Sequence, residues 1–200
     1  LVQHGVPVTM TREPGGTAIG EKIRSLLHDP AHAGMRPLTE VLLFSASRAQ
    51  LVAEIIAPAL ARGEIVLCDR YVESTLAYQG YGRGLDLGTL REIARYATGG
   101  LRSDLVIYLD LPVEVGLARK RAAHERADEE WTRMDQEELA FHQRVRAGYL
   151  AMAAAEPDRW CLVDGSQPIA AVQKQIQDRV ASLLACSREP GWTRGKEREP

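Results

Sequence analysis

The chain has 200 residues, a formal net charge of −2, and 45% hydrophobic and 26% charged residues. These values fit one globular domain with a sizeable core and exclude wholesale disorder. A charge near zero gives no reason to expect a nucleic-acid partner, because such binders are usually strongly basic. The three cysteines are widely spaced without a CxxC pair, so neither a disulfide framework nor a zinc site is indicated. No apolar run approaches the ~20 residues of a membrane span and no signal peptide is visible, so we expect a cytoplasmic protein without a membrane partner.

Short apolar runs alternate with longer stretches of helical periodicity. The apolar runs are continuous, as strands buried on both faces of a parallel sheet require. This alternation predicts a three-layer α/β domain, in which Pro58 kinks or ends the second helix. In chain order we expect strand 8–10, helix 18–27, helix 38–61, strand 65–68, helix 87–97, strand 105–109, helix 113–123, helix 136–155, strand 160–163 and helix 168–184.

The two ends of the chain differ from this pattern. Leu1 to Gly5 has the character of a helix end whose body is absent, with Gly5 as the stop. Ser187 to Pro200 is polar, punctuated by Pro and Gly, and without periodicity. We therefore expect one domain over residues 1–186 and a disordered tail over 187–200.

Polar residues follow each predicted strand at the point where the strand ends. Glu13 follows the first strand, Asp69 and Arg70 the second, Asp110 the third and Asp164 the fourth. In open α/β sheets the ligand crevice lies at the carboxyl ends of the strands. We therefore expect these side chains to gather on one rim.

Two segments near this rim have side chains that suit a nucleotide. The turn Thr11–Thr17 (TREPGGT) has glycines that permit close backbone approach, although a plain βα turn would look the same. Phe44 and Arg48 are four residues apart on one helical face, where a ring can stack on a base and a guanidinium can donate to a carbonyl. A core Phe beside a surface Arg is the alternative.

Two further segments suit phosphate chemistry. Asp69 lies where phosphotransferases place a carboxylate for Mg²⁺ or for the attacking oxygen, and Arg70 can bind phosphate bidentately; a helix-capping Asp with a surface Arg is the alternative. The arginines between Arg119 and Arg133 could form a mobile lid that brings cations onto phosphates. A solvated, salt-bridged helix and loop would give the same pattern.

Four segments in this order resemble the bacterial thymidylate kinases, which phosphorylate dTMP to dTDP. They are TREPGGT, LLFSASRAQ, DRYVESTLAYQGYGRG and LVIYLDLPVEVGLARKR, and the resemblance runs from about Val8 to Val180. It implies a P-loop-type nucleoside monophosphate kinase fold with a parallel sheet, ATP as co-substrate, Mg²⁺ as cofactor, and a homodimer that forms through the long helix at 38–61.

The resemblance also implies a role for each matching residue. Phe44 stacks on thymine, Arg48 bonds a base carbonyl, and Tyr78 lies against the deoxyribose. Arg24 holds the acceptor phosphate, and Arg70 bridges that phosphate and the transferring group. The remaining implied roles are Asp69 beside the metal and phosphates, Glu13 and Pro14 lining the acceptor pocket, Thr75 near the pyrimidine N3 edge, and Ser74 and Gln79 as further substrate contacts.

The chain departs from the family pattern in two places. The lid, expected at about 119–135, reads Thr132-Arg133-Met134-Asp135 where the family has Arg-Ile-Glu, so its catalytic arginine is Arg121, Arg126 or Arg133. No GxxxxGK string followed by Ser or Thr occurs in the 200 residues. The family's first strand and phosphate-binding loop are therefore expected to be missing from this chain.

A missing first strand has consequences for fold and activity. In the family that strand lies between the strands read here as second and third, so its loss leaves a gap of roughly 9–10 Å between two inner edges. We expect the chain alone to be unstable or rearranged, and inactive in phosphoryl transfer. Two alternatives remain: a deoxynucleoside kinase of the same fold, and a non-catalytic nucleotide-binding remnant.

Overall fold

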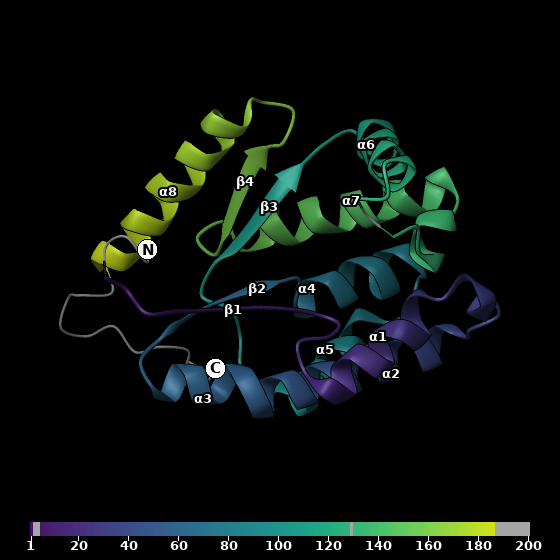
Figure 1. Cartoon of the computed structure of the whole chain (residues 1–200), viewed down its shortest axis with the longest axis horizontal. Coiled ribbons are helices and arrows are strands. Elements are labelled where there is room, and N and C mark those ends of the chain that lie inside the picture. Colours follow the sequence, from purple (N-terminus) through teal and green to yellow (C-terminus); the bar gives the residue numbers. More distant parts are fainter. Residues whose placement is uncertain (2–4, 129, 187–200) are drawn as a thin grey trace.

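Parallel strands and connecting helices make up the chain in the computed structural model, which describes residues 1, 5–128 and 130–186 (Figure 1). The expected tail at 187–200 lies outside the described residues. The elements are β1 (Val8–Arg12), α1 (Ala18–His28), η2 (Pro30–His32), α2 (Pro37–Leu51), η3 (Val52–Ile56), α3 (Ala57–Ala61), β2 (Ile65–Asp69), α4 (Val72–Thr75), η4 (Leu76–Gly82), α5 (Leu87–Thr98), β3 (Val106–Asp110), α6 (Val113–Glu125), η5 (Arg133–Gln136), α7 (Leu139–Ala155), β4 (Trp160–Asp164) and α8 (Ile169–Cys186). The predicted α/β alternation is confirmed.

Helices α1 and α5 begin at residues whose side chains cap them. Thr17 caps α1 by accepting from the amide of Gly20, and Asp86 caps α5 by accepting from the amide of Thr89. Gly99 ends α5 in the left-handed conformation at φ 62°. The last long helix before β4 starts at Leu139 rather than at the predicted 136, because residues 133–136 form a separate 3-10 turn closed by a capping box between Thr132 and Asp135.

The long helix after Pro37 changes its winding along its length. It begins as α2, becomes π-helical over η3 and resumes as α3. Pro58 lies in the first turn of α3, and the helix continues to Ala61, so the proline does not end it. By length and composition alone the segment Pro37–Ala61 could cross a membrane. Its buried polar side chains, Glu40, Ser47 and Arg48, are those of a core helix instead.

Within the described residues, the sheet is divided into two pairs of strands. β1 runs parallel to β2 with Val8 opposite Ile65, and β3 runs parallel to β4 with Val106 opposite Trp160. β2 and β3 do not pair with each other. The expected separation of these two strands is therefore present. Each pair leaves one inner edge whose backbone groups have no ladder partner from the other pair.

The strands are less buried than their composition predicts. Met10 is 80% exposed and Leu109 49% exposed, so the expectation of burial on both faces is wrong for these positions. α7 and α8 pack against β4, and α3 packs against β2. Figure 1 shows α8 beside β4 and α2–α3 below β1–β2.

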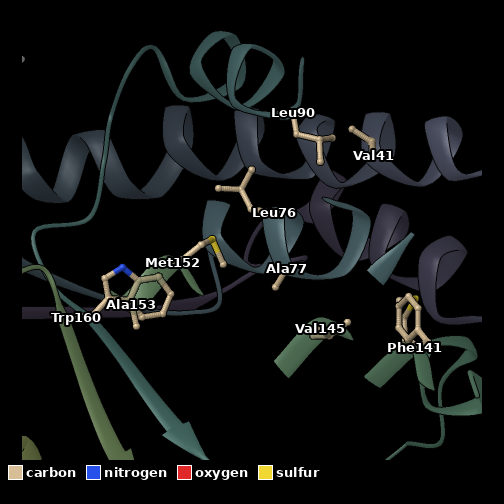
Figure 2. Close-up of a cluster of buried hydrophobic side chains, with 10 residues drawn as sticks. Val41, Leu76, Ala77, Leu90, Phe141, Val145, Met152, Ala153 and Trp160 are labelled. Atoms are coloured by element: carbon tan, nitrogen blue, oxygen red, sulfur yellow. The ribbon is translucent and has the colours of Figure 1, made fainter. Parts of the chain in front are cut away.

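One hydrophobic cluster holds the helices around η4 together (Figure 2). It includes Val41 of α2, Leu76 and Ala77 of η4, Phe141 of α7 and Trp160 of β4. Tyr149 of α7 stacks on Tyr108 of β3 with ring centroids 4.6 Å apart, which joins the β3–β4 pair to the same cluster. The side chains of η4 are therefore held on a rigid base.

Candidate nucleotide site

A cavity of about 1640 Å³ opens at the carboxyl ends of β1 and β2 and continues between β2 and β3. Ligand pockets usually measure about 300–1,000 Å³, so this space exceeds the needs of one small ligand. Its inner part is an apolar slot between the facing strand edges, lined by Ile65, Leu67, Val106 and Ile107. Its outer part is polar. The predicted site residues that line it are Glu13, Pro14, Arg24, Phe44, Asp69, Arg70, Ser74, Thr75, Tyr78 and Gln79.

The turn between β1 and α1 is held by its own polar groups. The amide of Gly15 donates to Ser47 Oγ at 3.1 Å, and the amide of Gly16 donates to Glu21 at 2.8 Å. Glu21 also pairs with Arg12 at 3.0 Å. The hydrogen bond from Gly16 is the main reason that the pKa of Glu21 is lowered. Because both glycine amides are engaged, this turn offers no free amide cradle for a phosphate.

Arg48 is buried at the back of the site. Its Nε donates to Glu13 at 2.7 Å, its Nη2 pairs with the same carboxylate, and Nη2 also donates to Thr75 Oγ1 at 2.7 Å. The guanidinium lies 5.7 Å from the ring centre of Tyr71. Arg48 itself does not line the cavity, but its Nη1 is buried without a hydrogen-bond partner. A buried guanidinium nitrogen of this kind is an unused donor.

The end of β2 brings Asp69 and Arg70 to the rim. The carbonyl of Asp69 accepts from the amide of Glu13 at 2.9 Å, which ties this end to the β1 turn. Arg70 has a φ of 66°, in the left-handed region that is costly for a residue with a Cβ. Its guanidinium lies 5.2 Å from the ring centre of Tyr78. Such strain at a rim position is typical of functional sites.

The helical turn α4–η4 carries the remaining predicted contacts. Ser74 Oγ hydrogen-bonds the hydroxyl of Tyr149 at 2.9 Å, and Thr75 faces Arg48. Tyr78 lines the cavity, with its ring 6.1 Å from that of Phe141. Gln79 is 1% exposed, and its amide nitrogen donates to Glu40 at 2.7 Å. That amide nitrogen is therefore already hydrogen-bonded within the protein.

Helix α1 contributes one predicted residue and one that sequence reasoning missed. Arg24 is half-buried and donates to the carbonyl of Pro14 at 3.1 Å. Burial and the charge of Arg12 lower the pKa of Arg24. His28, one turn later, also lines the cavity, and its Nδ1 is buried without a partner. Its position four residues after Arg24 is the signal that could have identified it.

The three candidate lid arginines lie outside the cavity lining. Arg121 lies over the ring of Trp131 at 5.6 Å, and Arg126 pairs with Asp128 at 2.8 Å in solvent. Arg133 is 4% exposed and pairs with Glu40 at 2.5 Å. Lys120, which lies in the same expected lid, does line the cavity. The structure therefore brings together the acceptor-side residues but none of the three arginines.

Asp69 is the residue expected to lie beside Mg²⁺. No group of three or more His, Cys, Asp or Glu side chains among the described residues could hold a metal ion. Mg²⁺ is usually bound by one or two carboxylates together with substrate phosphates, and Asp69 offers one such carboxylate on the rim. Asp69 could supply one ligand beside a bound nucleotide.

Comparison with known proteins places the chain in a family. The family model for thymidylate kinase matches residues 1–176. The chain is 54% identical over 193 residues to the thymidylate kinase of Roseiflexus castenholzii, covering 92% of this chain and 84% of that protein. It is 55% identical over 188 residues to the thymidylate kinase of Thermomicrobium roseum, covering 94% and 87%. The chain belongs to the thymidylate kinase family.

Membership in the thymidylate kinase family confirms the resemblance found in the sequence and the kinase fold that it implied. Enzymes with this name are nucleoside monophosphate kinases, and the α/β arrangement with parallel strands agrees with that fold. The family does not assign roles to individual side chains of this chain. Those roles rest on the contacts described above.

Proposed function

We propose that the rim of the cavity binds dTMP and that the reaction it serves is transfer of the γ-phosphoryl group of ATP to dTMP, giving dTDP. The observation that carries this proposal is the buried, unpartnered Nη1 of Arg48 behind a cavity lined by Phe44 and Thr75. A planar base with a carbonyl oxygen would satisfy that donor and cover the aromatic ring.

Each rim residue has a task in this proposal. Phe44 stacks on thymine, Arg48 and Thr75 read its polar edge, and Tyr78 lies against the deoxyribose. Arg24 and Arg70 neutralise the acceptor phosphate. Pro14 and the buried Glu13 shape the wall, with Glu13 fixing the orientation of Arg48 through two hydrogen bonds.

Catalysis then consists of positioning and charge neutralisation, without a covalent intermediate. Arg70 lies between the acceptor phosphate site and the open end of β2, so its guanidinium can follow charge onto the transferring group. Asp69 faces the same space and would orient the attacking phosphate oxygen. Of the lid cations, Lys120 on α6 is the one that lines the cavity, and we add it to Arg121, Arg126 and Arg133 as candidates for the catalytic lid cation.

The chain has fewer groups to bind the phosphates of ATP than to bind dTMP. The two glycine amides of the β1–α1 turn are engaged by Ser47 and Glu21, and the sequence contains no GxxxxGK string followed by Ser or Thr. We therefore propose that the 200-residue chain binds dTMP but does not form dTDP from ATP. Measurable dTDP formation by the purified chain would contradict this.

Titration calorimetry with dTMP and thymidine tests the acceptor site. We expect the chain to bind dTMP more tightly than thymidine, because Arg24 and Arg70 reach only the phosphate. Arg48→Met should weaken both ligands by at least about tenfold, the scale of a lost charge-assisted hydrogen bond. Arg95→Met serves as the control, since Arg95 lies exposed on α5, pairs with Glu92 and lies over the ring of Tyr96, away from the cavity. Equal affinity for both ligands would contradict the phosphate subsite.

Binding of dTMP and thymidine also tests the two alternative functions, a deoxynucleoside kinase and a non-catalytic remnant. A deoxynucleoside kinase of this fold would prefer thymidine to dTMP. A non-catalytic remnant would bind dTMP and stay inactive even when supplied with the missing elements of the family. The pair of rim cations, half-buried Arg24 and exposed Arg70, favours the monophosphate.

We also propose a homodimer that forms through α2. Leu38 and Leu42 are 58% and 52% exposed one turn apart, and Ala46 continues the same exposed face. A second copy of the chain would cover this stripe. Leu42→Glu should shift the mass measured by light scattering from dimer to monomer, whereas Ile169→Glu, at an 87% exposed site on α8, should not. A wild-type mass of one chain at all concentrations would contradict the dimer.

The remaining expectations stay as proposals. We expect a cytoplasmic protein that acts on nucleotides alone, without a nucleic-acid or membrane partner. We also expect residues 1–186 to act as one domain with its lid over about 119–135.

A further inference from the structure

Glu40 lies in the first turn of α2 with its carboxylate fully buried. Its Oε1 accepts from Gln79 at 2.7 Å, and its Oε2 pairs with Arg133 at 2.5 Å and with Arg83 at 3.2 Å. Burial alone would raise the pKa of Glu40, but these hydrogen bonds and charges more than offset it and lower that pKa. Glu40 is therefore an anion at the centre of a buried polar cluster, and it does not line the cavity.

Arg133 joins three elements through this cluster. Its Nη2 pairs with Glu40 of α2, and its Nε donates at 3.2 Å to the carbonyl of Leu27 near the end of α1. Arg133 itself begins η5, at the base of the expected lid. The carboxyl end of α1, the start of α2 and the base of the lid are thus fixed to one guanidinium.

The neighbours of these contact points carry the acceptor site. Arg24 and His28 lie one turn before and one residue after Leu27 and line the cavity. Gln79, which also holds Glu40, follows Tyr78 directly in η4. Met134 and Asp135, directly after Arg133, line the cavity as well. A movement of Arg133 would therefore move cavity residues on three elements.

Release of Arg133 toward a phosphate would be costly. It would leave the buried Glu40 with one arginine instead of two and Leu27 with an unmatched carbonyl. Breaking a buried ion pair by removing one partner is strongly destabilising, because the remaining charge is desolvated without compensation. The contacts of Arg133 thus hold α1, α2 and η5 together.

We infer that Arg133 and Glu40 form a clamp that positions the acceptor-nucleotide side of the site, and that Arg133 does not contact the phosphates. This inference rests on the proposed binding of dTMP at the rim. It makes both residues positioning residues and leaves phosphate contact to Arg24 and Arg70.

The ligands dTMP and thymidine distinguish a clamp from a phosphate contact. Arg133→Met and Glu40→Gln should each lower the affinity for both ligands by the same factor, about tenfold. Without the clamp, the cavity residues on α1, η4 and η5 are no longer held in position. Arg24→Met should weaken dTMP and spare thymidine, and Arg95→Met should change neither. The double variant Glu40→Gln/Arg133→Met should weaken binding no more than the single variants. A loss confined to dTMP in Arg133→Met would overturn the inference.

Amide hydrogen exchange tests the clamp without any ligand. Arg133→Met and Glu40→Gln should speed exchange in residues 24–29 and 133–138 by about tenfold or more, through easier local opening. Arg95→Met should leave those segments unchanged. Unchanged exchange in both clamp variants would overturn the clamp. A wild-type chain that binds neither ligand would count against the proposed function, and the exchange result would still decide the clamp.

Discussion

Arg70 combines a strained backbone with a rim position. Its φ of 66° is one that glycine adopts freely and other residues do not. If the guanidinium is kept for the phosphate, the strain is tolerated for function and not for stability. Two substitutions at this residue separate the two contributions.

Arg70→Gly and Arg70→Ala should both lose dTMP affinity, since both lack the guanidinium. They should differ in stability, with Arg70→Gly more stable than Arg70→Ala by about 1 kcal/mol, because only alanine keeps a Cβ in the left-handed region. Urea unfolding of the two variants measures this difference. Equal free energies of unfolding would show that the backbone at residue 70 relaxes.

His28 should make the stability of the protein depend on pH. Burial and then the charges of Arg24 and Arg70 lower its pKa from 6.5 to about 4, with Arg133 acting in the same direction and Asp135 opposing. Between pH 6.5 and 4 the unfolded chain therefore binds a proton that the folded chain does not. The free energy of unfolding should fall as the pH drops through this window.

Chemical denaturation at pH 7 and pH 5 measures the effect of His28. His28→Gln should reduce the difference in unfolding free energy between the two pH values, and His32→Gln, at an exposed site on η2, should leave it unchanged. An identical pH dependence in His28→Gln and the wild type would place the titration elsewhere.

The sequence predicted many of the residues that line the cavity but not their partners. Phe44 and Arg48, four apart on a helix, could be recognised from local spacing. The contact between Arg133 and Leu27 could not, because it joins residues 106 positions apart and depends on how η5 docks. The residues next to Arg133 in the sequence would suit an exposed lid arginine equally well, so they do not reveal that its side chain is buried in an ion pair.

At the scale of elements, η4 and α7 approach closely through glycines. A Cβ built on Gly148 of α7 would lie 2.5 Å from the ring of Tyr81, and one on Gly82 of η4 would lie 2.6 Å from Phe141. Such contacts leave no room for a methyl group. The close approach brings the hydroxyl of Tyr149 to Ser74 and thereby fixes the helix that carries Thr75 and Tyr78.

Gly148→Ala should therefore lower the free energy of unfolding by about 1–3 kcal/mol, the usual cost of overpacking. Gly116→Ala on α6 is the matched control, because a Cβ there meets nothing within 4 Å. The control should gain up to about 1 kcal/mol from better helix propensity. Equal destabilisation of both variants would indicate a backbone effect instead of a contact with Tyr81.

Element boundaries were predictable wherever capping residues are local, as at Thr17 and Gly99. The π-helical winding of η3 and η4 was not, because it has no pattern in the side chains. The burial of the strands was overestimated, because a continuous apolar run such as Leu105–Leu109 predicts a strand but not which helices cover its two faces.

At the scale of the molecule, the divided sheet should limit stability. β2 and β3 each present an unpaired edge to a cavity of about 1640 Å³, and unpaired backbone groups are costly when buried. We expect the purified chain to melt with low cooperativity at or below the usual mesophile range of about 45–65 °C. A sharp calorimetric transition well above this range would contradict the prediction.

The two inner edges also have a consequence in concentrated solution. An exposed strand edge is a template for pairing with another chain, and β2 and β3 offer two such templates with apolar side chains beside them. Molecules joined through these edges would add strands head to tail without closing into a ring. The same slot that enlarges the cavity thus provides a route to fibrous, β-rich aggregates, and charged substitutions along Ile65–Cys68 would be the natural place to block them.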